Sequence, residues 1–190
     1  TVLRIVNVSL HRRDGRKLLD NVSFEVNEGE ILGIAGVSGN GQLELGNSVI
    51  GLRQVTEGQI WFGAEDVTNM SAGQRLAMGY AHIFEDRALN VLGEFSVRDN
   101  VALSLYARRD FGRRWFLDYD KVQELSRQIV ADYNVKCAGL ESPVAQLSGG
   151  NQQKLVLGRI LATHPRLVWA HNPTKGLDVA SCHFIYDSLM

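Results

Sequence analysis

The feature that most constrains the fold is an apolar run that leads through a glycine-rich loop into a helical segment. Ile31–Ala35 is short and apolar, as expected for a strand buried on both faces of a sheet. It continues into residues 36–41 (GVSGNG) and then into 42–50, which has helical character. Glycines let such a loop curl so that its N–H groups point at phosphate oxygens, and the helix N-terminus adds positive potential. The layout predicts a phosphate loop, with ordinary turn glycines of an α/β protein as the alternative.

The rest of the chain continues the alternation of strands and helices. The expected strands are Val2–Val8, Ser23–Val26, Gly58–Phe62, Tyr80–Phe84 and Leu167–Ala170. The expected helices are 71–78 with Ser71 as N-cap, 97–133 interrupted by a loop at 108–116, 148–163, and 179 onward. This order predicts an α/β core with a parallel sheet, and the helical stretch in its middle predicts a separate subdomain.

Length and composition narrow the class further. The 190 residues predict one domain, or one domain and a fragment, and 45% hydrophobic content argues against disorder. A net charge of −1 argues against a nucleic-acid partner and an acidic tail. Two cysteines, Cys137 and Cys182, favour a reducing cytoplasm over a disulfide framework. No apolar run reaches the ~18 residues that a transmembrane helix needs, so none is predicted.

The glycine loop departs from the working phosphate-loop pattern at two positions. The pattern G-x-x-x-x-G-K-[ST] fits Gly36 and Gly41, but Gln42 and Leu43 replace the lysine and the hydroxyl. The loop therefore lacks the cation that neutralises phosphate and the oxygen that holds Mg²⁺. The candidate nucleotide-binding residues are Gly36, Val37, Ser38, Gly39, Asn40, Gly41, Gln42 and Leu43.

A second and more specific cluster opens the helix expected at 148–163. A serine and two glycines at its start expose bare N–H groups and the positive helix end, which predicts an anion site on the surface. The alternative is an ordinary helix capped by Ser148. The candidate residues are Leu147, Ser148, Gly149, Gly150, Asn151 and Gln152.

With these residues in view, the chain resembles the nucleotide-binding domain of ABC transporters from about Val2 to Met190. Residues 147–154 resemble the family signature in the form that simple-sugar and nucleoside importers have. Residues 36–43 resemble the phosphate loop of their second cassette. Residues 167–174 resemble the Walker B strand. Residues 175–178, ending in Asp178, resemble the D-loop, and 84–87, including Glu85, resemble the segment that replaces the Q-loop in this group.

The resemblance implies an α/β fold: a P-loop NTPase-like parallel sheet core with an antiparallel β subdomain and a helical subdomain. We expect a β subdomain and phosphate-loop core over 1–96, the helical subdomain over 97–140, and the signature helix, Walker B-like strand and D-loop over 141–190. In this fold a further strand lies between the phosphate-loop and Walker B strands, so the chain is expected to be truncated before its last core strand.

The Walker B segment departs from the family as well. His171 and Asn172 stand where the family has an aspartate and a glutamate, so with Gln42 and Leu43 four chemical positions of one site are replaced. Phosphoryl transfer depends on positioning and charge neutralisation, so this site is expected to be weak or inactive, with no intact catalytic residue and no metal. His171 is interpreted as a buried or partly buried core histidine after a strand. His11 lies near the family's adenine-stacking aromatic, although a surface histidine is the favoured interpretation.

In this family two cassettes pair head to tail, and each ATP lies between the phosphate loop of one and the signature of the other. The resemblance therefore implies the C-terminal cassette of a tandem ATPase that couples ATP to uptake of nucleosides or simple sugars. Its signature completes the partner's ATP site, where Mg²⁺ is expected. The expected partners are the N-terminal cassette, membrane permease subunits and, indirectly, a substrate-binding protein, with no nucleic acid, at the cytoplasmic face of the membrane.

Two alternatives stay open: a regulatory or structural nucleotide-binding domain without turnover, and a non-transport translation factor built from the same cassette. The translation factor is disfavoured by Gln42 at the lysine position of the phosphate loop and by the residues of the signature. The basic, aromatic loop at 108–116 suggests nucleic-acid or lipid-headgroup binding, but a solvated loop near the permease is the favoured interpretation.

Overall fold

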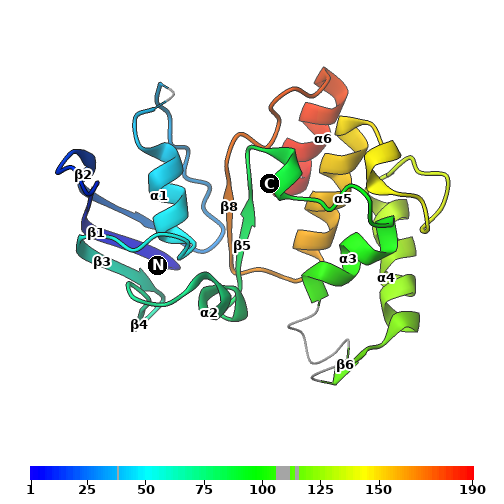
Figure 1. Cartoon of the computed structure of the whole chain (residues 1–190), viewed down its shortest axis with the longest axis horizontal. Coiled ribbons are helices and arrows are strands. Elements are labelled where there is room, and N and C mark those ends of the chain that lie inside the picture. Colours follow the sequence, from blue (N-terminus) through cyan, green and yellow to red (C-terminus); the bar gives the residue numbers. More distant parts are fainter. Residues whose placement is uncertain (38, 106–111, 114–115) are drawn as a thin grey trace. The chain divides into compact units, whose positions relative to one another are not determined.

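The structure is a computed structural model that describes residues 1–37, 39–105, 112–113 and 116–190. The chain forms two compact units, one of residues 1–82 with 166–169 and one of 83–165 with 170–190 (Figure 1). Within the described ranges, no helix has the length and apolar character needed to cross a membrane.

An antiparallel sheet of four strands forms most of the first unit. Its order is β2-β1-β3-β4. The strands are β1 (Leu3–His11), β2 (Lys17–Val26), β3 (Glu57–Phe62) and β4 (Glu65–Asp66). The strands predicted at Val2–Val8, Ser23–Val26 and Gly58–Phe62 are confirmed, and the first two are longer than expected.

The sheet is distorted where β1 meets both of its neighbours. The β1–β2 register shifts between Ile5 and Val8, and Asn7 and Asn21 both have positive φ. Gly58 on β3 has φ +86°, and a Cβ there would overlap the backbone of Asn7, so this position requires glycine.

Two short helices accompany this sheet. In α1 (Gln42–Val49), Leu45 and Val49 join a core that includes Ile5 and Phe62. Helix α2 (Ala72–Ala77) begins with a capping box in which Ser71 and Gln74 bond each other's backbone N–H groups. Both predicted helices and the Ser71 cap are confirmed.

Parallel pairing appears between β5 (Tyr80–Ile83) and β8 (Leu167–Ala170). The N–H of Arg166 donates to the Gly79 carbonyl at 2.8 Å, and the N–H of His171 donates to the Ile83 carbonyl at 2.9 Å. Both partners advance in the same direction along the chain, so the two strands are parallel, as the sequence predicted.

The strand predicted at Ile31–Ala35 is wrong for the described structure. These residues belong to no strand, and Ile31 and Ile34 are 68% and 42% exposed. A strand buried on both faces needs a hydrogen-bonding neighbour and covering layers. The described residues provide no paired strand for this segment, so its apolar side chains stay in contact with solvent.

Helices dominate the second unit, where α3 (Val97–Leu105), α4 (Tyr119–Asp132) and α5 (Gly149–Leu161) pack on one another. Their core includes Val101, Leu105, Val122, Ile129 and Leu155. The 3-10 turns are η1 (Arg87–Leu89) and η3 (Val144–Gln146), and α6 (Val179–Leu189) closes the described chain. The helices predicted in these regions are confirmed.

The predicted basic, aromatic loop lies largely outside the described residues. Two short strands, β6 (Gly112–Arg113) and β7 (Phe116–Leu117), pair within it. Both interpretations of this loop stay predictions.

A buried arginine fixes the end of the phosphate-loop helix. The Arg75 side chain, in a residue only 1% exposed, donates from Nη1 to the carbonyls of Ser48 and Val49 at 2.7 and 2.6 Å and from Nη2 to that of Thr68. Carbonyls at a helix C-terminus lack intrahelical donors, so a cation placed there satisfies them and complements the helix dipole.

We expect Arg75→Met to lower the free energy of unfolding by about 2 kcal/mol or more, because charge-assisted bonds to buried carbonyls are lost. Chemical denaturation measures the change. Arg16→Met, at an exposed turn position, is the matched control and should stay within about 0.5 kcal/mol of the parent. Equal stability of the two variants would contradict this role for Arg75.

Candidate functional site

The glycine loop in the first unit has the backbone of an anion-binding loop. Gly39 and Gly41 adopt φ of +90° and +93°, and Gly41 is the N-cap of α1 without a side-chain cap. A Cβ at Gly41 would lie 2.7 Å from the Leu18 carbonyl, so only glycine fits this turn. The first N–H groups of α1 therefore point out of the helix with no intrahelical acceptor. Ser38 lies outside the described residues.

The side chains of Gln42 and Leu43 offer phosphate no positive charge and offer Mg²⁺ no carboxylate or hydroxyl. Gln42 folds back so that its amide nitrogen lies where a Cβ of Gly36 would stand. Leu43 is half exposed and has no oxygen, and the next residue, Glu44, places a carboxylate in the first turn of α1. Among the described residues, no group of three or more His, Cys, Asp or Glu side chains could hold a metal. ATP could be held here through backbone N–H groups alone.

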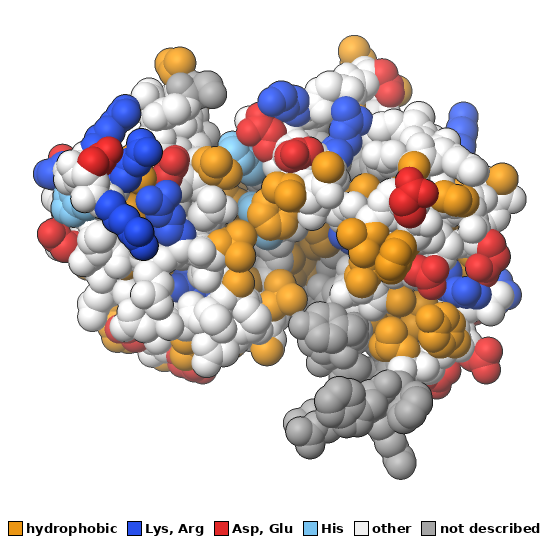
Figure 2. All heavy atoms as spheres, in the orientation of Figure 1, with side chains coloured by type: hydrophobic (Ala, Val, Ile, Leu, Met, Phe, Trp, Pro, Cys, Tyr) orange, Lys and Arg blue, Asp and Glu red, His pale blue; other side chains and the backbone are white. Residues whose placement is uncertain are grey.

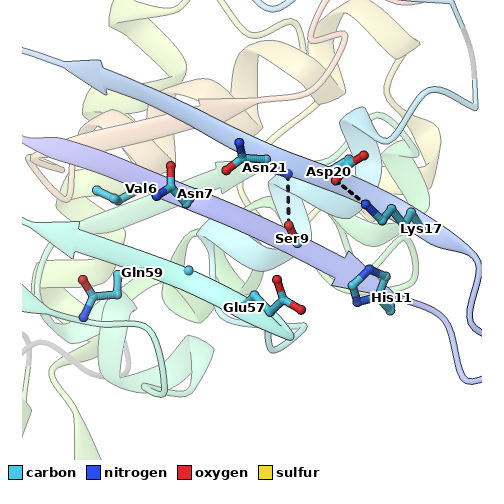
Figure 3. A pocket seen from close by; sticks show the side chains of 10 residues that line it. Val6, Asn7, Ser9, His11, Lys17, Asp20, Asn21, Glu57 and Gln59 are labelled. Atoms are coloured by element: carbon cyan, nitrogen blue, oxygen red, sulfur yellow. Dashed lines mark hydrogen bonds and ion pairs between the residues drawn. The ribbon is translucent and has the colours of Figure 1, made fainter.

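A shallow groove of about 560 Å³ lies on the distorted face of the antiparallel sheet (Figure 3). His11 lines one end of it, and its Nδ1 lies 3.2 Å from the Thr56 hydroxyl. Lys17 and Asp20, also in its lining, form an ion pair at 2.7 Å. The structure thus places His11 at the sheet surface, where stacking on a base stays a prediction.

Lys and Arg side chains gather over the turn between β1 and β2 (Figure 2). Arg12, Arg13, Arg16 and Lys17 are exposed there. Arg12 lies 3.6 Å from Asp14, and Lys17 is paired with Asp20, so acidic neighbours offset part of the charge.

In the second unit, His171 and Asn172, which the sequence predicts to be replaced Walker B residues, lie beside Glu85. The Lys175 ammonium donates to Glu85 Oε1 at 2.6 Å, and His171 Nε2 lies 3.6 Å from Oε2. Asn172 also hydrogen-bonds this carboxylate. The hydrogen bonds from Lys175 and Asn172 hold the pKa of Glu85 below its usual value, and the charges of Lys175 and His171 add to this. We call these four residues the Glu85 cluster.

The Glu85 cluster has a charge pattern opposite to that of a magnesium site. The cluster has one carboxylate, at 85, beside an imidazole at 171, an amide at 172 and a lysine at 175. Glu85 is thus satisfied by cationic and amide donors from the chain itself. His171 was expected to be a buried or partly buried core histidine; it is partly buried, and its ring nitrogen lies beside this carboxylate.

The signature residues open α5, as predicted. The Ser148 hydroxyl caps the helix, accepting from the Asn151 backbone N–H at 3.4 Å and from its side-chain Nδ2 at 2.9 Å. The Gln152 amide donates to the carbonyls of Val144 and Leu147 and holds the preceding turn. Ser148 is exposed, and the N–H groups of the following glycines have no intrahelical acceptor.

Both signature glycines are positions where a side chain would clash. A Cβ at Gly149 would overlap the Arg87 guanidinium, and one at Gly150 would lie 2.7 Å from the Ser181 hydroxyl. Ser181 donates in turn to Asp178, the N-cap of α6, and these bonds lower the pKa of Asp178. Residues 149 and 150 must therefore be glycines, because the Arg87 and Ser181 side chains occupy the space that their Cβ atoms would need.

Residues 19–175 match the family model described as ABC transporter. The chain belongs to this family of ATPase domains. The nucleoside import ATP-binding protein NupA of Lactococcus lactis subsp. cremoris is 34% identical over 190 residues, which are 100% of this chain and 38% of that protein. The guanosine import ATP-binding protein NupO of Bacillus subtilis is 33% identical over 100% of this chain and 37% of that protein. The chain thus spans little more than a third of these relatives.

Solved structures support the fold. An ATP-binding cassette in a dimeric post-hydrolysis state bound to ADP and Pi superposes with a TM-score of 0.83 at 23% identity, covering 98% of this chain and 81% of that chain. The expected α/β cassette fold, with its antiparallel β part and its helices, is confirmed.

The structure brings together some predicted site residues and adds others. His171 and Asn172 meet at Glu85, and Asp178 lies at the signature through Ser181. Sequence reasoning gave no individual role to Arg87, which packs on Gly149, or to Arg159, whose guanidinium is buried in the second unit. A lone arginine in the apolar run 155–161 was the available signal for Arg159.

We expect Glu85→Gln to lower the melting midpoint at pH 7, because the Lys175 ion pair is lost. The lowered pKa of Glu85 favours its ionised form in the folded chain. Its contribution is thus present above the ordinary value of 4.5 and is lost as pH falls through the folded-state value. The difference between parent and variant should shrink below about pH 4.5.

Melting midpoints measured from pH 7 to pH 3.5 test this expectation. Glu94→Gln, an exposed glutamate of the same unit, controls for the general effect of removing a carboxylate. A difference for Glu85→Gln that is no larger than the control's, or that does not change with pH, would refute the ion pair's contribution.

Proposed function

We propose that this chain is the second cassette of a tandem ATPase subunit that drives uptake of nucleosides or simple sugars. Its own site is inert or weak, and its signature completes the ATP site of the first cassette. The observation that carries the proposal is the contrast within one chain. The residues 147–152 keep every donor of the signature, whereas Gln42, Leu43, His171 and Asn172 remove the charge and metal ligands of the other motifs.

Several findings support this proposal. The matched relatives are named as import ATP-binding proteins for nucleosides, guanosine and ribose, and each is nearly three times as long as the matched segment. A protein of that length has room for two cassettes. The donors at Ser148, Gly149 and Gly150 suit the γ-phosphate of an ATP held by another phosphate loop.

The partners and location follow from the same proposal. We expect the N-terminal cassette as direct partner, membrane permease subunits contacting the helical part expected at 97–140, and an indirect substrate-binding protein. The chain would act at the cytoplasmic face of the membrane, with Mg²⁺ at the first cassette's loop. A nucleotide-binding domain without turnover is the second candidate, since Gln42 and Leu43 favour it for this chain taken alone.

Ser148→Arg in the full tandem subunit tests the signature's role. A bulky cation at this exposed cap would displace the γ-phosphate, so we expect ATP turnover to fall at least ~100-fold. Gln128→Arg, exposed on α4, adds the same side chain away from the signature and should leave turnover unchanged. Unchanged turnover in Ser148→Arg would reject the proposal.

The chain's own loop gives a second test. Because Leu43, His171 and Asn172 supply no metal-binding carboxylate or hydroxyl, ATP affinity measured by titration of the chain should be the same in excess Mg²⁺ and in EDTA. An affinity that rises about tenfold or more with Mg²⁺ would show that metal ligands exist here after all.

A further inference from the structure

Arg159 is a cation inside the apolar side of the signature helix. Its neighbours along α5 include the buried Leu157 and Ile160. Burial lowers the pKa of its guanidinium to about 10, and it forms no ion pair with any described carboxylate. Burying a cation without a counter-charge costs free energy, and the hydrogen bonds of the guanidinium have to offset this cost.

These hydrogen bonds join helix α3 and the segment after η1 to helix α5. Arg159 Nη1 donates to the Asn100 carbonyl at 2.8 Å, and Nη2 donates to the Asn90 carbonyl. Asn100 belongs to α3, whereas Asn90 follows the η1 turn that begins at Arg87. The planar fork of arginine suits two separate carbonyls, which a lysine could not contact in the same way.

Asn90 holds the Glu85 segment through hydrogen bonds of its side chain. It is 5% exposed, and its side-chain Oδ1 accepts from the Phe84 N–H at 2.9 Å. Its Nδ2 donates to the carbonyls of Phe84 at 2.7 Å and Asp86 at 3.2 Å. The residues on both sides of Glu85 are therefore bonded to the asparagine whose own carbonyl Arg159 holds.

The Asn100 side chain holds residues 92–96 by hydrogen bonds in the same way. It is fully buried, its Oδ1 accepts from the Leu92 N–H, and its Nδ2 donates to the carbonyls of Leu92, Phe95 and Ser96. Residues 84–96 thus surround the buried side-chain amides of Asn90 and Asn100, and the main-chain carbonyls of both asparagines accept hydrogen bonds from Arg159.

The same stretch also touches the other end of α5, because the Arg87 side chain lies against Gly149. Gly149 and Arg159 are ten residues apart, about 15 Å along a helix. Segment 84–100 is therefore attached to the signature helix at its first turn and near its last.

We propose that Arg159 is a positioning residue that sets where the Ser148–Gly150 start of α5 stands relative to the Glu85 segment. The proposal rests on the proposed function, since it concerns the same signature. Loss of the Arg159 bonds frees the far end of α5 to shift. A misplacement of about 1 Å at a phosphate contact lowers turnover far more than it lowers ATP affinity.

The test uses the full tandem subunit assembled with its permease. We expect Arg159→Lys to lower kcat by about tenfold or more, with KM for ATP changed less than about threefold and the melting midpoint within about 2 °C of the parent. Asn90→Ala keeps the carbonyl that Arg159 bonds but removes the side-chain bonds to Phe84 and Asp86, so it should lower kcat similarly. The double variant should be no slower than the slower single variant, because both substitutions interrupt the same series of hydrogen bonds from Arg159 to the Glu85 segment. Arg127→Lys, exposed on α4, is the matched control.

Two results would overturn the positioning role: an unchanged kcat in Arg159→Lys, or fully additive effects of the two substitutions. A fall in kcat that only follows a lowered melting midpoint would also overturn it, since that is a general structural defect. Ser148→Arg measured in parallel separates the proposals. Lost turnover in Ser148→Arg with normal kcat in Arg159→Lys rejects the positioning role alone, whereas normal turnover in Ser148→Arg rejects the function on which it rests.

Discussion

The Glu85 carboxylate joins two segments of the second unit that lie far apart in the sequence. Lys175 and His171 come from the segment after β8, and Glu85 comes from the segment after β5, ninety residues earlier. The two segments lie at the ends of paired parallel strands, so sheet geometry alone brings them to one edge. Hydrogen bonds through Asn90 then link the Glu85 segment to Arg159, and the Arg87 side chain links it to the signature glycine.

The starts of α1 and α5 differ in their side chains more than in their backbone. Both α1 and α5 open with glycines and unbonded N–H groups, so both offer a positive end to an anion. Around α5, Ser148 supplies a hydroxyl and Arg87 adds a nearby cation. Around α1, Gln42 folds over the loop and Glu44 adds negative charge. This difference in side chains is the basis of the proposal that the start of α5, and not that of α1, meets a phosphate.

Local patterns in the sequence were enough to predict most elements and the motif positions. The Ser71 capping box and the Ser148 cap could be predicted because a cap depends on residues three apart. The strand expected at Ile31–Ala35 could not be judged locally, since a buried strand depends on neighbours far along the chain. The Glu85 cluster and the Arg159 bonds join residues 59 to 90 positions apart, and no spacing rule connects them.

Phosphate release in a single turnover tests the central claim most directly. The full tandem subunit with its permease is loaded with two ATP and Mg²⁺, and the phosphate formed is counted by rapid quench. The proposed function predicts one hydrolysable site per tandem subunit, because the first cassette's ATP would meet the signature of this chain, whereas Gln42 and Leu43 leave this chain's own loop without the lysine and the hydroxyl. Release of two phosphates per subunit at equal rates would contradict the account, since the loop with Gln42 and Leu43 would then support hydrolysis.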